Sequence, residues 1–147
     1  MPFTDSYANS ILNYLMAKTG SLTAPSAVYI GLTKNDPTIN GTFEELSGNG
    51  YSRVLISSKG VSYPDVIGSA SDRAITNSKQ INWTKATAKW PEAKGFILSS
   101  SSTVGETTSI FFYGALDTPV TCDAGAVALF DPQTLKISIP ATDLDTN

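Results

Sequence analysis

Side chains that could do acid–base or nucleophilic chemistry are scarce in this sequence. Its 147 residues include no histidine and a single cysteine, Cys122. Histidine is the commonest general base and metal ligand near neutral pH, so the usual catalytic triads are excluded. Glu44 and Glu45 are adjacent in a stretch that we expect to be extended, which points them to opposite faces and prevents them from forming an acid and base pair there. The sequence therefore predicts no catalytic residues and no enzyme.

Ligands for metals, phosphates and other cofactors also lack a recognisable spacing. Asp143 and Asp145 alternate as in a calcium-binding loop, but the glycine and the distal glutamate of such a loop are missing. No glycine-rich run ends in Gly-Lys-Ser or Gly-Lys-Thr, the pattern that cradles a phosphate. Cys122 has no second cysteine to pair with, and we predict that it is a small buried residue. We expect no cofactor and no metal site.

The composition is that of a folded, weakly charged protein. Apolar residues make up 41% of the chain, and the length suits one domain, which we assign to residues 1–147. Charged residues make up 16%, and the net charge of −3 comes without a run of lysines or arginines, so we expect no nucleic-acid binding. No apolar stretch is long enough to span a bilayer, and the first residues do not resemble a signal peptide. We expect neither membrane insertion nor signal-directed export.

The segment 4–19 is the clearest predicted helix. Thr4 or Asp5 can cap its start, Phe3 is placed as a staple residue, and Gly20 supplies a left-handed stop. Apolar residues fall on one stripe at helical spacing, namely Tyr7, Ile11, Leu12 and Leu15. Two interpretations remain open: the stripe covers the core of a sheet, which we favour, or it docks on a neighbouring subunit.

From residue 27 onward the apolar period changes to two, as in Val28, Ile30 and Leu32. Short strands are predicted at 27–32, 42–46, 51–56, 80–83, 95–99, 108–114, 116–122, 126–130 and 135–139. A long polar loop covers 57–73, a hydroxyl-rich hairpin loop covers 99–106, and an acidic tail covers 140–147. The fold class is therefore mainly β: an antiparallel β-sandwich over 27–139, or a barrel-like domain, of about eight strands with one N-terminal helix.

The strand around 110–113 is apolar on both faces. Ile110 and Phe112 share one face, and Phe111 and Tyr113 share the other. Such a strand is either central and covered by the helix, or its outer face is a subunit interface, which we slightly favour. The predicted interface combines this face with the helix stripe, and its residues are Tyr7, Ile11, Leu15, Phe111 and Tyr113.

The remaining aromatic side chains and one cation leave further alternatives. A sugar could stack on an exposed aromatic ring, and we predict Tyr63 and Trp90 as the residues of such a glycan contact. The simpler interpretation is that each of these side chains belongs to the core of the sheet. Arg53 stands beside Tyr51 in a predicted strand, where we expect it to form a structural ion pair or to stack on an aromatic ring.

Several short elements occur in an order that resembles a known family. The first two elements are the segments 7–13 and 24–33. They are followed by Asp36-Pro37-Thr38 and by the Gly-x-Gly-Tyr-x-Arg element at 48–53. An Ala-Thr-Ala-x-Trp element follows at 86–90, then Tyr-Gly-x-Leu at 113–116 and a closing strand pair at 125–139. This order is similar to that of short bacteriophage proteins labelled tail fibre proteins.

The resemblance implies a virion structural protein without catalytic residues, made in the host cytoplasm. It would assemble with copies of itself and with other virion proteins of the tail, neck or capsid, as a tail, neck or collar fibre component. Two alternatives are a capsid decoration protein and a receptor module that binds a host-surface glycan.

Overall fold

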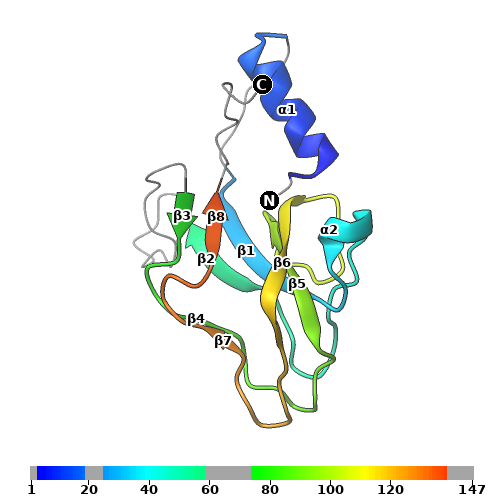
Figure 1. Ribbon diagram of the computed structural model, residues 1–147, viewed down its shortest axis with the longest axis vertical. Coiled ribbons are helices and arrows are strands. Elements are labelled where there is room, and N and C mark those ends of the chain that lie inside the picture. The colour runs from blue at the N-terminus through cyan, green and yellow to red at the C-terminus, as the bar shows by residue number, and fades with distance from the viewer. Residues whose placement is uncertain (1–2, 19–24, 59–73, 139–147) are drawn as a thin grey trace, which may run out of the picture.

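The computed structural model describes residues 3–18, 25–58 and 74–138 (Figure 1). In chain order the elements are α1 (Asp5–Leu15), β1 (Ala27–Thr33), α2 (Pro37–Asn40), β2 (Val54–Ser58), β3 (Ala74–Thr76), β4 (Ile81–Asn82), β5 (Ala93–Ser99), β6 (Ile110–Val120), β7 (Leu129–Phe130) and β8 (Lys136–Ser138). Tyr63, Gly20, the tail 140–147 and most of the predicted loop 57–73 lie outside the described residues.

The largest sheet has four antiparallel strands in the order β2-β1-β5-β6. Ile30 of β1 pairs with Leu98 of β5, and Leu98 pairs in turn with Phe112 of β6. The period-two pattern places these three side chains on one face, where each is at most 3% exposed. β6 is an edge strand of this sheet, because β5 is its one strand partner there.

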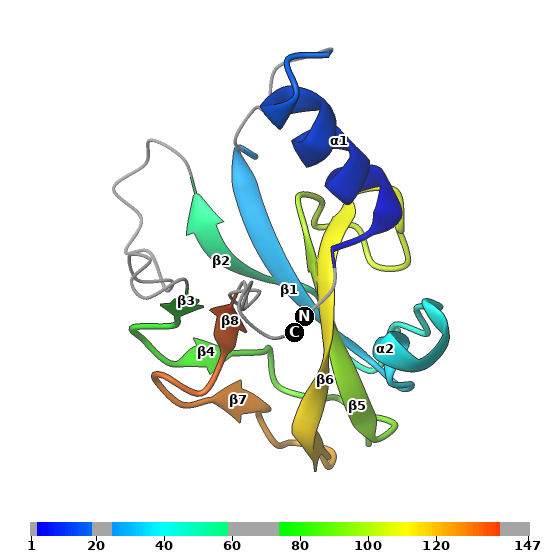
Figure 2. The ribbon, with the colours of Figure 1, turned by 45° about the horizontal axis from the view of Figure 1, so that its top comes forward.

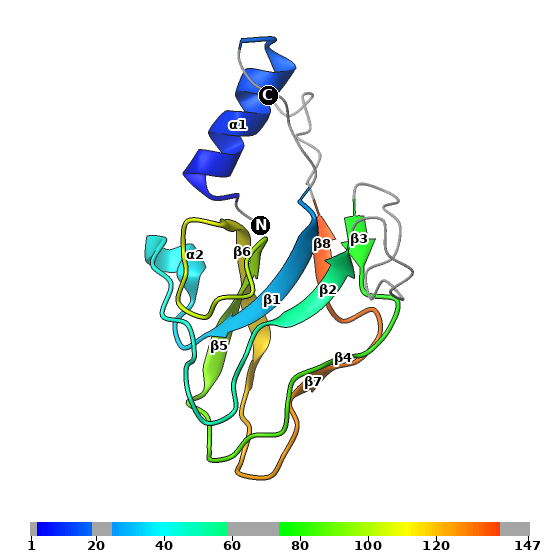
Figure 3. The same cartoon turned by 180° about the vertical axis from the view of Figure 1, so that it is seen from behind.

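Two short antiparallel ribbons, β3–β8 and β4–β7, cover one side of this sheet (Figures 2 and 3). Side chains from both layers form one apolar core, which includes Ile30, Leu32, Phe96, Phe112, Trp83 and Leu135. The prediction of a mainly β, antiparallel fold with an N-terminal helix is confirmed. The barrel-like alternative is wrong, since the described strands form separate sheets and close no barrel.

The other side of the sheet carries α2 and the loop between β5 and β6 (Figure 2). This close packing depends on two glycines. A Cβ on Gly95 would lie 2.4 Å from Cδ of Pro37, and one on Gly31 would lie 2.8 Å from a carboxylate oxygen of Glu45. The sheet is therefore covered on both sides in its middle, which explains why every residue of 30–33 and 95–99 is buried.

Two predicted strand assignments are wrong. The strands expected at 108–114 and 116–122 are one strand, β6, because Gly114 stays paired with Phe96 and the chain does not turn there. The segment 42–46 contributes a single bridge, between Glu45 and Thr33, instead of a strand. A short helix not expected from the sequence, α2, follows β1; its first residue is Pro37, and its N-cap, Asp36, accepts from the Thr38 N–H.

The helix is also shorter than the predicted 4–19. It ends at Leu15, and Ala17 takes the left-handed conformation with φ of 53°. Thr4 is the N-cap residue but makes no side-chain capping bond, because its hydroxyl donates to the Ile110 carbonyl instead. No residue of α1 is buried. The favoured interpretation, a helix that covers the core, is therefore wrong.

Candidate assembly surface and the buried cluster beside it

Helix α1 is joined to the sheet by its N-terminal end. Phe3 forms a bridge with Phe112 of β6, and their rings meet edge to face at 4.8 Å. The Thr4 N–H donates to the Phe111 carbonyl at 3.1 Å, and the Thr4 hydroxyl donates to the Ile110 carbonyl at 3.0 Å. These bonds extend the edge of β6 by a short antiparallel segment, which fixes the direction in which α1 leaves the sheet.

The second half of α1 points away from the sheet and exposes a patch of apolar side chains. Leu12 is 57% exposed, Leu15 63% and Met16 64%. Spacings of three and four residues place these side chains on one face of the chain, which we call the α1 patch. Figure 1 shows α1 at the end of the molecule farthest from β4 and β7. The patch is thus open to solvent and remote from most of the sheet.

The structure places the five predicted interface residues in three environments. Tyr7 and Phe111 pack on each other with ring centroids 5.3 Å apart, and both are half-buried. Tyr113 packs on Phe43 at 5.3 Å, through an edge-to-face contact. Ile11 is half-buried and Leu15 is exposed. Met16 was missed by the sequence analysis, although its spacing of four from Leu12 could have included it.

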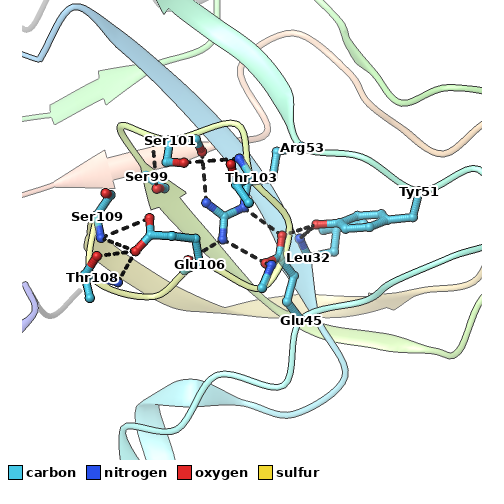
Figure 4. Close-up of polar contacts among 11 residues, drawn as sticks. Leu32, Glu45, Tyr51, Arg53, Ser99, Ser101, Thr103, Glu106, Thr108 and Ser109 are labelled. Carbon is cyan, nitrogen blue, oxygen red and sulfur yellow. Dashed lines mark hydrogen bonds and ion pairs between the residues drawn. The ribbon is translucent and has the colours of Figure 1, made fainter.

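A buried ion pair lies under the loop between β5 and β6 (Figure 4). Arg53, directly before β2, donates to Glu45 through Nε and Nη2, each at 2.8 Å. The side chain of Arg53 is 0% exposed and that of Glu45 5%. This bidentate geometry confirms the predicted structural ion pair of Arg53. Its partner was not predicted, because nothing in the sequence shows that Glu45 faces inward.

The same guanidinium group holds the hairpin loop. It donates to the carbonyls of Ser101 at 2.9 Å and Glu106 at 2.6 Å, so that the loop closes around it (Figure 4). Glu45 accepts the N–H of Gly105 from the same loop at 2.7 Å. Residues 100–109 are thereby tied to the chain before β2, across a large separation in sequence.

Tyr51 completes this cluster. Its hydroxyl donates to Glu45 at 2.9 Å and accepts the N–H of Leu32 at 2.8 Å. Burial, and then the negative charge of Glu45, raise the pKa of Tyr51 well above its ordinary range. Both carboxylate oxygens of Glu45 accept two hydrogen bonds each. The cluster therefore has no free acid or base for catalysis, and its chemistry is that of a rigid support.

Two of the motifs that suggested a family contact each other. Gly48, Asn49 and Gly50 all have positive φ, between 54° and 81°. This turn presents the Asn49 carbonyl to the indole N–H of Trp90 at 2.9 Å, and the Trp90 ring meets Tyr51 edge to face at 5.5 Å. Trp90 is 3% exposed, so a sugar could reach its ring only if this contact opened.

We also searched residues 3–18, 25–58 and 74–138 for a metal site and for a membrane-spanning helix. There, no three side chains of cysteine, aspartate or glutamate gather as they would around a metal ion. None of the helices described is long and apolar enough to cross a bilayer. Cys122 is buried, as predicted.

A family model described as podophage GP4 fiber I protein gp80 matches residues 2–138, which is nearly the whole chain. A comparison with curated proteins finds no match. The match confirms the resemblance inferred from the ordered motifs, and it makes the protein a virion-associated structural component of a fibre, outside the known enzyme families. The chain belongs to the podophage GP4 fiber I protein gp80 family.

Proposed function

We propose that this chain is a fibre component of the tail, neck or collar that assembles with copies of itself and with other virion proteins through α1. The observation that carries the proposal is the α1 patch. A helix of 11 residues is marginally stable alone, and helices in proteins are held mainly by packing of their apolar face. In α1 the apolar face is exposed to solvent from Leu12 onward, so a partner that packs on this face would stabilise the helix.

The chemistry of α1 favours a partner with the same surface. Its sequence from 5 to 15 contains one charged residue, Asp5, at the end nearest the sheet. Two copies could therefore bring their patches together without placing like charges opposite each other. Ile11 and Leu15, with Leu12 and Met16, would form the centre of this interface, and Tyr7 on Phe111 would form its base. Tyr113, which packs on Phe43, would lie outside this centre.

The size of the patch limits how it can be used. Burying the exposed part of each of its three side chains is worth about 1 kcal/mol, hence about 3 kcal/mol per copy. Association costs roughly 4–15 kcal/mol in lost freedom of motion. A single pair of patches is therefore marginal. We infer that several copies contribute, or that another virion protein adds surface to the contact.

The mass of the protein in solution tests the proposal. Light scattering over micromolar concentrations should give a mass above that of one chain. The double variant Leu12→Gln/Leu15→Gln should shift this equilibrium to the monomer while the sheet remains folded. Ile39→Gln is the matched control, because Ile39 is 79% exposed on α2 and lies outside the patch.

Two results would contradict the proposal. One is a monomeric mass for the natural sequence at every concentration, together with a particle reconstruction in which α1 touches no other subunit. The other is an oligomer that survives the double variant unchanged. A reconstruction would also distinguish a fibre of the tail, neck or collar from a protein bound to the capsid surface.

A further inference from the structure

A groove of about 490 Å³ runs between α1 and the start of β6. Tyr7 and Phe111 are part of its wall, and most of the other lining side chains carry a hydroxyl group. These hydroxyl residues come from α1, from the chain before β1 and from the β5–β6 loop, and they include Thr4, Ser6, Ser10, Ser26, Ser100 and Ser109. Its volume lies within the roughly 300–1,000 Å³ that is usual for ligand sites.

Several hydroxyl groups of this groove are available to a ligand. Within the described residues, the side-chain oxygens of Ser6, Tyr7, Ser26 and Ser100 have no hydrogen-bond partner in the protein. Each hydroxyl can donate one hydrogen bond and accept others. They also stand on three separate segments of the chain, so a molecule in the groove could bond to more than one wall. A ligand rich in hydroxyl groups fits this pattern.

The groove is also uncharged. No aspartate, glutamate, lysine or arginine lines it. The nearest acid along the loop is Glu106, whose carboxylate accepts hydrogen bonds from Thr108 and Ser109. By contrast, a second groove, of about 620 Å³ beside the end of β6, is lined by Asp117, Asp131 and Lys136. A neutral molecule suits the first groove, since no cation there would repay the desolvation of an anion.

The Tyr7 ring supplies the apolar part of the wall. It is half-buried against Phe111, with the centroids 5.3 Å apart. The C–H faces of a sugar ring are apolar and its rim is hydroxylated, which matches a wall of two aromatic rings beside free serines.

From these features we propose that the groove between α1 and the β5–β6 loop binds a neutral saccharide of one to three sugar rings. An extended neutral peptide has few hydroxyl groups but could bond to the serine hydroxyls through its backbone N–H and C=O groups, so it is the alternative that the test must separate. The loop wall is held in place before binding by Arg53 and Glu45. Such preorganisation lowers the entropic cost of binding.

The saccharide site can be tested separately from self-assembly, although Tyr7 and Phe111 belong both to the groove wall and to the base of the proposed interface. Ser6 and Ser10 are one turn apart and face the groove, whereas Leu12, Leu15 and Met16 form the α1 patch. Loss of either activity can therefore be observed without loss of the other, for instance in the Leu12→Gln/Leu15→Gln variant.

The test is an array of neutral and acidic mono-, di- and trisaccharides, followed by titration calorimetry on any hit. We expect at least one neutral probe, of the size of lactose or diacetylchitobiose, to bind. Ser100→Trp should fill the groove and weaken this binding by about tenfold or more, equal to about 1.4 kcal/mol. Ser102→Trp is the matched control, because Ser102 is an exposed residue of the same loop that does not line the groove.

Each other outcome overturns the proposal. If no neutral saccharide on the array binds, the groove is not a saccharide site. Binding of 3′-sialyllactose as tight as that of lactose contradicts the selection against charge. If Ser100→Trp leaves the binding of the saccharide unchanged, the saccharide binds outside this groove. If the acetylated peptide Gly-Ser-Gly-Ser binds in a Ser100-dependent way and no sugar does, the groove is a peptide site.

Discussion

Two neighbouring regions, one under the β5–β6 loop and one beside the start of β6, show opposite kinds of structure. Under the loop, Arg53 and Glu45 are almost fully buried, and every oxygen of the carboxylate is hydrogen-bonded. Beside the start of β6, α1 is attached through Phe3, Thr4 and Tyr7. None of the residues of the helix is buried. The first region is complete within one chain, whereas the second has an apolar surface left over.

This difference suggests a division of labour within a fibre subunit. A rigid sheet whose loop is fixed by a buried ion pair presents its surfaces in one geometry. A helix with an exposed apolar face offers a surface on which another subunit can pack. Variants of the two regions should therefore differ in what they change: those of the ion-pair cluster should lower stability, and those of α1 should change association and local order.

The largest effect is expected for Glu45→Ala. The variant leaves the buried guanidinium of Arg53 without its charge partner, and breaking one side of a buried pair costs about 3–5 kcal/mol. The free energy of unfolding should fall by this amount in urea titrations. Glu44→Ala is the control, because Glu44 is the exposed neighbour and should change stability by less than about 0.5 kcal/mol. Equal effects of the two variants would show that the ion pair does not hold the loop.

The next largest effect is expected for Gly95→Ala. The new methyl group would lie 2.4 Å from Cδ of Pro37 and 2.8 Å from the Asn35 carbonyl oxygen, so either β5 or the α2 segment must move. Overpacking of this kind costs about 3 kcal/mol at the upper end of its usual range. Gly41→Ala adds the same methyl group in open space and should show only the left-handed backbone penalty of about 1 kcal/mol. A Gly95→Ala protein as stable as the natural one would mean that the α2 side is loosely packed.

Much of the sheet could be predicted from local pattern, because its strands carry it in their own residues. The alternation of Val28, Ile30 and Leu32 predicts β1, and the apolar run at 110–113 predicts the start of β6. The ribbon β3–β8 was predicted only in part. The strand expected at 135–139 contains β8, but no strand was expected at Ala74–Thr76. β3 has three residues and is formed by pairing with β8, so its existence depends on distant contacts.

The candidate site shows the same limit. The stripe on the helix could be predicted from spacing, but its exposure could not. The direction of α1 depends on distant contacts at its start, among them the hydrogen bond from the Thr4 hydroxyl to the Ile110 carbonyl at a separation of 106 residues. In the same way, the spacing of Glu45 and Arg53 does not reveal that both turn inward against a loop that begins nearly 50 residues later.

A smaller effect is expected for Phe3→Ala, which removes the contact that attaches α1. Phe3 is half-buried on Phe112, so we expect a loss of about 2 kcal/mol, below the 3–5 kcal/mol of a fully buried ring. Hydrogen exchange should become faster in α1 while the amides of β1 and β5 remain protected. Tyr14→Ala is the control, because Tyr14 is 51% exposed. If exchange rises equally in β1 and β5, α1 and the sheet unfold as one unit and the contrast between the two regions fails.

The smallest effect concerns Glu106 and pH. Its carboxylate accepts from Thr108 and from the N–H of Ser109, and these hydrogen bonds, that of the Thr108 hydroxyl first, lower the pKa of Glu106 below its usual range. A lowered pKa in the folded state stabilises the loop fully above the ordinary carboxyl pKa of about 4.3, and this stabilisation is lost as the pH falls through the lower folded value. Amide NMR shifts of Thr108 and Ser109 should therefore titrate below the ordinary pH range of a glutamate carboxyl, and Glu106→Gln should abolish the titration. The amides of Ser101 and Gly105, which Arg53 and Glu45 hold, should not follow it. If they did, the loop would depend on Glu106 as much as on the buried pair, and the buried cluster would no longer be the part that makes this region rigid.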